Sequence, residues 1–86
     1  MAWRKVLATL NALEVHLSPE VYFEEATRQG LETSIASVRD RLKFFESQGY
    51  VSGNQLMGYR VTAHAREKLG LDKLEGASPD MSEEAP

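Results

Sequence analysis

The segment from residue 32 to residue 51 constrains the fold more than any other stretch of the chain. It reads ETSIASVRDRLKFFESQGYV, and its large apolar residues recur at steps of three and four: Ile35, Val38, Leu42 and Phe45. This spacing puts them on one face of an α-helix. Gly49 then ends the helix and is followed directly by Tyr50 and Val51, residue types that favour strands. The pattern predicts a helix that rests on a core by one face and leads into a β-strand.

The opposite face of this helix is polar, and its side chains are small near the start. It carries Thr33, Ala36, Asp40, Lys43 and Ser47, with Ser37 and Arg39 at its margins. Short side chains with a few charges suit contact with a DNA groove. A hydrated helix face is the ordinary alternative, because amphipathic helices generally turn their polar side to water.

Length and composition indicate one small domain. A chain of 86 residues buries only about 60–65% of the surface that its unfolded form exposes. The absence of cysteine excludes disulfides and thiolate metal sites, and cytoplasmic residence is the simplest expectation. No apolar run approaches the ~20 residues that span a bilayer, so no membrane association is expected.

The sequence contains no set of residues typical of an enzyme. His16 and His64 lie far apart without ligand-spaced partners, and there is no Ser/His/Asp set or glycine-rich phosphate loop. Glu20, Glu24 and Glu25 form a carboxylate cluster, which we interpret as a solvated group near a positive helix end. We therefore expect no catalysis, no cofactor and no metal.

The charge distribution is more informative than the formal charge of −3. The last twelve residues, 75–86, hold four of the 13 acidic residues, which leaves nine acidic against ten basic residues in 1–74. This mildly basic remainder permits phosphate contact without requiring it. Residues 75–86 read EGASPDMSEEAP, a composition typical of a disordered acidic tail. Such a tail can also compete with phosphate for the basic residues between Arg28 and Arg60.

Two further helices are predicted before residue 32. Residues 2–16 carry an apolar stripe at helical spacing, made of Trp3, Val6, Leu7, Leu10, Leu13 and Leu17. Ser18 suits the N-cap and Pro19 the first position of a second helix, which runs to about Gln29 and ends at Gly30. The short interval before the third helix, which Thr33 or Ser34 can cap, makes a tight corner between two helices.

A hairpin and a last helix are predicted after Gly49. We expect strands at 50–52 and 56–61 around a turn at 53–55. Gly58 inside the second strand indicates a bulge or a close backbone approach. Thr62 then caps a helix over residues 63–71.

The order helix, helix, helix, hairpin, helix resembles the winged helix-turn-helix DNA-binding domain, a family of small transcriptional regulators. Residues 42–51, LKFFESQGYV, are similar to the family's sequence motif at the end of the recognition helix. Residues 59–69, YRVTAHAREKL, are similar to its second wing strand and following helix cap. The resemblance covers about residues 2–74 and implies a mainly α domain with a small β-hairpin, of the α+β class, over 1–74. Three features depart from the family pattern. Ala65 stands where glycine is frequent, and Asp40 stands where a second basic residue is frequent. The expected wing tip, residues 52–55, contains no Arg or Lys.

The resemblance implies sequence-specific binding of double-stranded DNA. Helix 32–48 would enter the major groove, and the hairpin 50–61 would form the wing. The residues expected to contact DNA are Thr33, Ser34, Ser37, Arg39, Asp40, Lys43, Asn54 and Arg60.

The resemblance also implies a dimeric regulator, since many relatives bind two half-sites. The expected interface residues are Trp3, Leu7 and Phe44. The alternative is a winged-helix module that binds a protein and never touches DNA. The low net charge, the uncharged hairpin tip and Asp40 favour this alternative.

Overall fold

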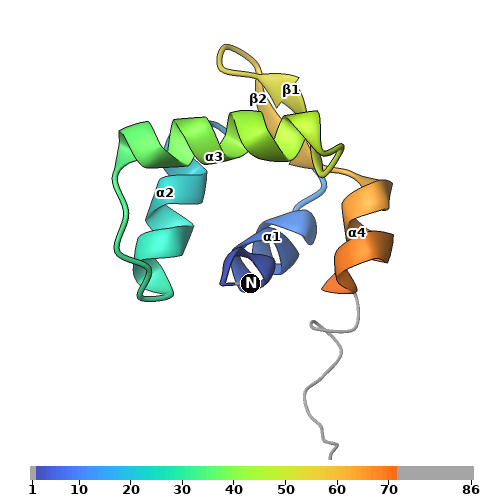
Figure 1. The fold of residues 1–86 in the computed structure, drawn as a ribbon, viewed down its shortest axis with the longest axis horizontal. Helices are drawn as coiled ribbons and strands as arrows, with labels where there is room; N and C mark the ends of the chain where they lie inside the picture. The colour runs from blue at the N-terminus through green and yellow to red at the C-terminus, as the bar shows by residue number, and fades with distance from the viewer. Residues whose placement is uncertain (1, 72–86) are drawn as a thin grey trace, which may run out of the picture.

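Three helices, a β-hairpin and a fourth helix follow one another in the predicted order (Figure 1). The computed structural model describes residues 2–71, which form a small compact α+β domain. The elements are α1 (Trp3–Asn11), α2 (Pro19–Arg28), α3 (Ile35–Ser47), β1 (Val51–Asn54), β2 (Gly58–Val61) and α4 (Ala63–Leu69). The expected acidic tail, 75–86, lies outside the described residues.

Helix α1 is shorter than the predicted helix over 2–16. It ends at Asn11, and Glu14 adopts a left-handed conformation with φ 55°. The chain turns here because Leu17 forms two backbone hydrogen bonds with Tyr59 of β2, of 2.9 and 2.7 Å. Leu13, expected on the buried stripe, is consequently 54% exposed. The stripe therefore predicted the helix correctly but not its end.

The corner between α2 and α3 is formed largely by the residues that the sequence indicates. Pro19 begins α2, and the backbone of Gly30 has the positive φ of 89° that ends it. Helix α3 begins at Ile35, later than the predicted residue 32, because Ser34 is its N-cap. The Ser34 hydroxyl accepts a hydrogen bond of 3.2 Å from the backbone N–H of Ser37.

The hairpin is antiparallel, with Val51 opposite Val61 and Asn54 opposite Gly58. Its turn lies at residues 55–57, so the predicted turn at 53–55 was wrong. Oδ1 of Asn54 accepts hydrogen bonds of 2.9 and 2.7 Å from the N–H groups of Leu56 and Met57, which folds the chain at this later point. Leu56, expected in the second strand, lies at the tip and is 94% exposed.

Helix α4 is capped as predicted, but it ends at Leu69 and not at residue 71. The Thr62 hydroxyl accepts a 3.1 Å hydrogen bond from the N–H of Ala65. Gly70 ends the helix in a left-handed conformation and lets Leu71 turn into the core, where it is fully buried.

One hydrophobic core holds these elements together. Helix α1 lies beneath α3, with α2 on one side and α4 on the other (Figure 1). Trp3 of α1 meets Phe45 of α3 edge to face, with 5.9 Å between the ring centroids. The buried side chains include Val6, Leu7, Leu10, Tyr22, Val38, Leu42, Phe45, Val51, Tyr59, Val61 and Leu71. None of the helices in residues 2–71 has the length and apolar character needed to cross a membrane.

Candidate nucleic-acid interface

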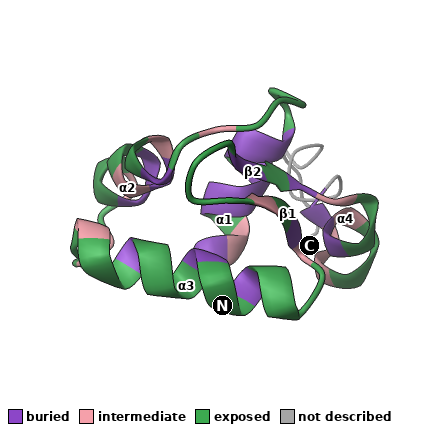
Figure 2. Cartoon of the chain, turned by 90° about the horizontal axis from the view of Figure 1, so that it is seen from above, coloured by how far each residue is buried: buried purple, intermediate pink, exposed green. Residues whose placement is uncertain are grey.

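Helix α3 turns one uncovered side to solvent. Only Val38, Leu42 and Phe45 of this helix are buried, and they face the core. Figure 2 shows α3 along the lower edge of the domain, coloured mostly as exposed. The exposed residues of α3 are Ala36, Ser37, Arg39, Asp40, Arg41, Lys43, Phe44, Glu46 and Ser47. We call this surface the α3 outer face.

The structure brings half of the predicted DNA-contact residues onto the α3 outer face. Ser37, Arg39, Asp40 and Lys43 lie there together. Thr33, half-buried, and Ser34, exposed, precede the helix instead of lying on it, because the hydroxyl of Ser34 caps its first turn.

The remaining two predicted contact residues lie on the hairpin. Arg60 is exposed on β2, opposite Ser52 of β1. Asn54 is exposed at the end of β1, but its side-chain oxygen already accepts the two hydrogen bonds that shape the turn. The side-chain amide nitrogen of Asn54 can still donate a hydrogen bond to a ligand.

The charge on the α3 outer face is close to balanced. Arg39, Arg41 and Lys43 are exposed cations, and Asp40 and Glu46 are exposed anions. The guanidinium of Arg41 lies over the ring of Phe45, 5.8 Å from its centroid. Arg41 therefore already forms a cation–π contact within the domain. The face can therefore donate and accept hydrogen bonds but attracts phosphate only weakly.

Arg39 forms an ion pair that the sequence did not indicate. Its Nη2 lies 3.3 Å from Oε2 of Glu20, in the first turn of α2. The two residues are far apart in the chain and meet only because α2 packs against α3. No local spacing signals this pair.

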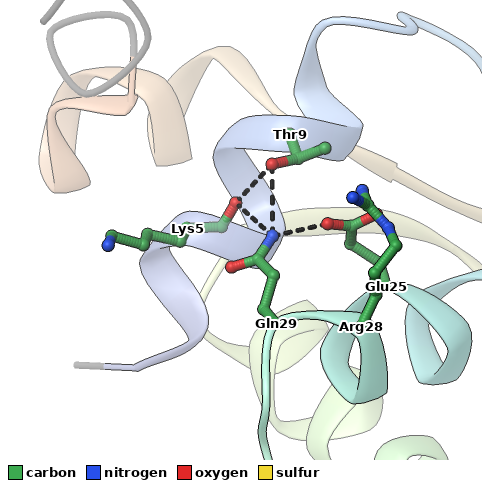
Figure 3. A network of polar contacts seen from close by, with 5 residues as sticks. All are labelled: Lys5, Thr9, Glu25, Arg28 and Gln29. Carbon is green, nitrogen blue, oxygen red and sulfur yellow. Dashed lines mark hydrogen bonds and ion pairs between the residues drawn. The ribbon is translucent and has the colours of Figure 1, made fainter. Parts of the chain in front are cut away.

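A second polar cluster lies away from the α3 outer face, between α1 and α2 (Figure 3). Glu25 is only 7% exposed, and it pairs with Arg28 and accepts a 2.5 Å hydrogen bond from Nε2 of Gln29. The same Gln29 nitrogen lies 3.3 Å from the hydroxyl of Thr9 and 3.4 Å from the carbonyl oxygen of Lys5. The cluster therefore ties α2 to α1.

The interpretation of Glu25 as a solvated carboxylate was wrong. Arg28 and Gln29 follow it at the helical spacings i+3 and i+4, which was a signal available in the sequence. Burial acts to raise the pKa of Glu25, but the hydrogen bonds from Gln29 and Arg28 and the positive charge of Arg28 outweigh it. The pKa of this carboxyl consequently lies below its ordinary value of 4.5.

Replacing Glu25 by alanine will lower the free energy of unfolding by about 1–3 kcal/mol near neutral pH, because the amide of Gln29 loses its shortest acceptor. A lowered folded-state pKa means that Glu25 stabilises the fold fully above its ordinary pKa of 4.5. This contribution is lost as the pH falls through the folded-state pKa. Urea unfolding at about pH 7 and about pH 2.5 will therefore show a difference between wild type and variant that shrinks in acid.

The matched control for this experiment is Glu24→Ala. Glu24 is the exposed neighbour on the same helix. Its replacement will change the free energy of unfolding by about 0.5 kcal/mol or less at either pH. Equal losses in the two variants would contradict the role of Glu25 in joining α1 to α2.

Only one of the predicted dimer-interface residues lies at the surface. Trp3 is 7% exposed and Leu7 is fully buried, both within the core of the single chain. Phe44 is 53% exposed on α3. Residues 2–71 contain no group of three His, Asp or Glu side chains placed to hold a metal ion.

The described residues thus define a small α+β domain that presents an uncovered helix face and a short hairpin. No protein-family model, no curated protein and no solved structure matches the chain.

Proposed function

We propose that the chain is a winged helix-turn-helix protein that binds double-stranded DNA, with α3 in the major groove. The observation that carries the proposal is the α3 outer face, whose side chains are exposed from Ala36 to Ser47, while Val38, Leu42 and Phe45 are buried on the opposite side. The major groove, about 12 Å wide, admits an α-helix presented in this way.

The arrangement around α3 supports this proposal. Helix α2 packs against α3 across a short connection, as the first helix of a helix-turn-helix pair does. The β1–β2 hairpin follows α3 directly and is the proposed wing, with Arg60 as a phosphate contact. On α3, Ser37 and Lys43 can donate to base edges or phosphates, and Asp40 can accept from the amino group of cytosine.

A homodimer that reads two half-sites is part of the proposal. Phe44 supports it as an exposed aromatic residue, since aromatic side chains are enriched in protein interfaces.

Selection from a library of random duplexes with the purified protein tests DNA binding and site symmetry together. The mass of the protein in solution tests the oligomeric state. Absence of any duplex affinity at low salt, both for the full chain and for residues 1–74, would reject DNA binding.

Replacing Lys43 by alanine will weaken binding to all duplexes by a similar factor. Loss of one phosphate contact reduces the slope of log K against log salt concentration by about 0.9. Titration of a labelled duplex at several salt concentrations measures both effects. Lys68→Ala is the control, because Lys68 is an exposed lysine in the last turn of α4. That end of α4 lies away from α3 (Figure 1). Equal changes in the two variants would show that Lys43 acts only through the net charge of the protein.

A protein-binding function is the second candidate, and exposed apolar side chains favour it. Phe44 is 53%, Leu56 94% and Met57 64% exposed. Capture of one defined protein partner that is abolished by Phe44→Ala, without nucleic acid in the captured material, would favour this function over DNA binding.

A further inference from the structure

The ion pair between Arg39 and Glu20 joins the α3 outer face to the first turn of α2. Their side chains are 46% and 59% exposed, so both charges lie at the surface where a duplex would approach. Two features hold the carboxylate in place. Pro19 restricts the backbone at the start of α2, and the positive end of the helix favours an acidic side chain there.

Among the carboxylates of the described residues, Glu20 is the one that engages a cation of the α3 outer face. Asp40 and Glu46 lie on α3 itself, and Glu24 lies one turn along α2, but no ion pair joins any of these three to a cation in residues 2–71. The Glu20 carboxylate therefore occupies the position at Arg39 that a phosphate oxygen of DNA would take. An arginine binds carboxylates and phosphates through the same N–H groups.

We propose that Glu20 competes with DNA phosphate for Arg39 and thereby suppresses sequence-independent binding. Glu20 acts on DNA binding through Arg39. The inference depends on the proposed DNA-binding function.

The relative strengths of the contacts set the size of this competition. An exposed ion pair contributes a factor of about five or less to an equilibrium constant. That is enough to offset much of a single phosphate contact. A bidentate arginine contact to guanine contributes about 5- to 150-fold in discrimination against the wrong base. A matching base can therefore displace Glu20 from Arg39, whereas a phosphate alone gains little.

The test is the affinity of the full chain for a random-sequence duplex of about 20 base pairs, a length of about two turns of DNA. Glu20→Gln will bind up to about fivefold more tightly at low salt than the wild type. The slope of log K against log salt concentration will steepen by about 0.9, because Arg39 becomes free to displace one counterion.

Glu24→Gln is the matched control. It removes the same charge from an exposed position on the same helix, four residues further on, without touching Arg39. Its effect on the affinity and on the salt slope will be clearly smaller than that of Glu20→Gln. Thermal unfolding of both variants will match the wild type within a few degrees, since both sites are exposed.

A second comparison isolates the role of Arg39. In the Arg39→Ala background, Glu20→Gln and Glu24→Gln will have equal effects on the affinity and on the salt slope, because Glu20 no longer has Arg39 to pair with. Equal effects of the two substitutions in the wild-type background, with normal DNA binding, would overturn the role of Glu20 alone. An excess effect of Glu20→Gln that persists without Arg39 would also overturn it. A wild-type protein that binds no duplex at all would overturn both this inference and the proposed function.

Discussion

Replacing Phe45 by alanine will lower the free energy of unfolding by about 3–5 kcal/mol. Phe45 is 1% exposed and lies at the centre of the aromatic packing that joins α3 to the rest of the fold. Its ring centroid lies 5.9 Å from that of Trp3 and 6.1 Å from that of Tyr50. Since a small domain is stable by only about 5–15 kcal/mol, this single change will bring the protein close to unfolding. Urea unfolding followed by circular dichroism measures the loss.

Phe44→Ala provides the control for this prediction. It removes the same side chain from the adjacent residue, but Phe44 is 53% exposed. The expected loss is about 1 kcal/mol or less, because little apolar surface is returned to water. Equal losses in the two variants would mean that α3 is rotated about its axis relative to the structure. The face that we assign to DNA would then be wrong as well.

Replacing Gly58 by alanine will lower the free energy of unfolding by about 2–4 kcal/mol. A Cβ atom at this position would lie 2.7 Å from the carbonyl oxygen of Leu17, and the backbone has a φ of +91° that side chains rarely adopt. The added methyl group must push β2 away from Leu17. The two hydrogen bonds between Tyr59 of β2 and Leu17, in the connection between α1 and α2, are then weakened.

Gly30→Ala separates the two causes of this loss. Gly30 has nearly the same backbone conformation, with φ +89°, but a Cβ atom there meets nothing within 4 Å. Its replacement will cost only the backbone strain, about 1 kcal/mol. Thermal unfolding of the two variants compares them directly. If Gly58→Ala costs no more than Gly30→Ala, the close approach between Gly58 and Leu17 does not exist in solution.

The parts of the fold that were predicted correctly depend on residues near one another in the chain. Val38, Leu42 and Phe45 share one helix face by spacing alone, and all three are buried. The caps at Thr62 and at Ser34, one of the two candidates for α3, require only a hydroxyl three residues before a free N–H group. The close backbone approach expected at Gly58 was also correct, although the sequence did not identify its partner.

The errors arose where a distant segment decided the outcome. The apolar stripe continues through Leu13, but α1 ends at Asn11 because the chain must turn to place Leu17 beside Tyr59. The position of the hairpin turn depends on which side chain satisfies the free N–H groups at the tip, and Asn54 does so. Glu25 is a partial exception, since its partners lie close in sequence but its burial requires α1.

The candidate site divides in the same way. The sequence by itself determined the polar face of α3, since Ser37, Asp40 and Lys43 are exposed there simply because the opposite stripe is buried. Only the tertiary structure decided that Trp3 and Leu7 belong to the core and that Glu20 occupies Arg39. Helical periodicity orients side chains about one axis, whereas burial and ion pairing depend on how separate helices pack. That packing minimises the exposed apolar surface of the whole chain, which no single segment encodes.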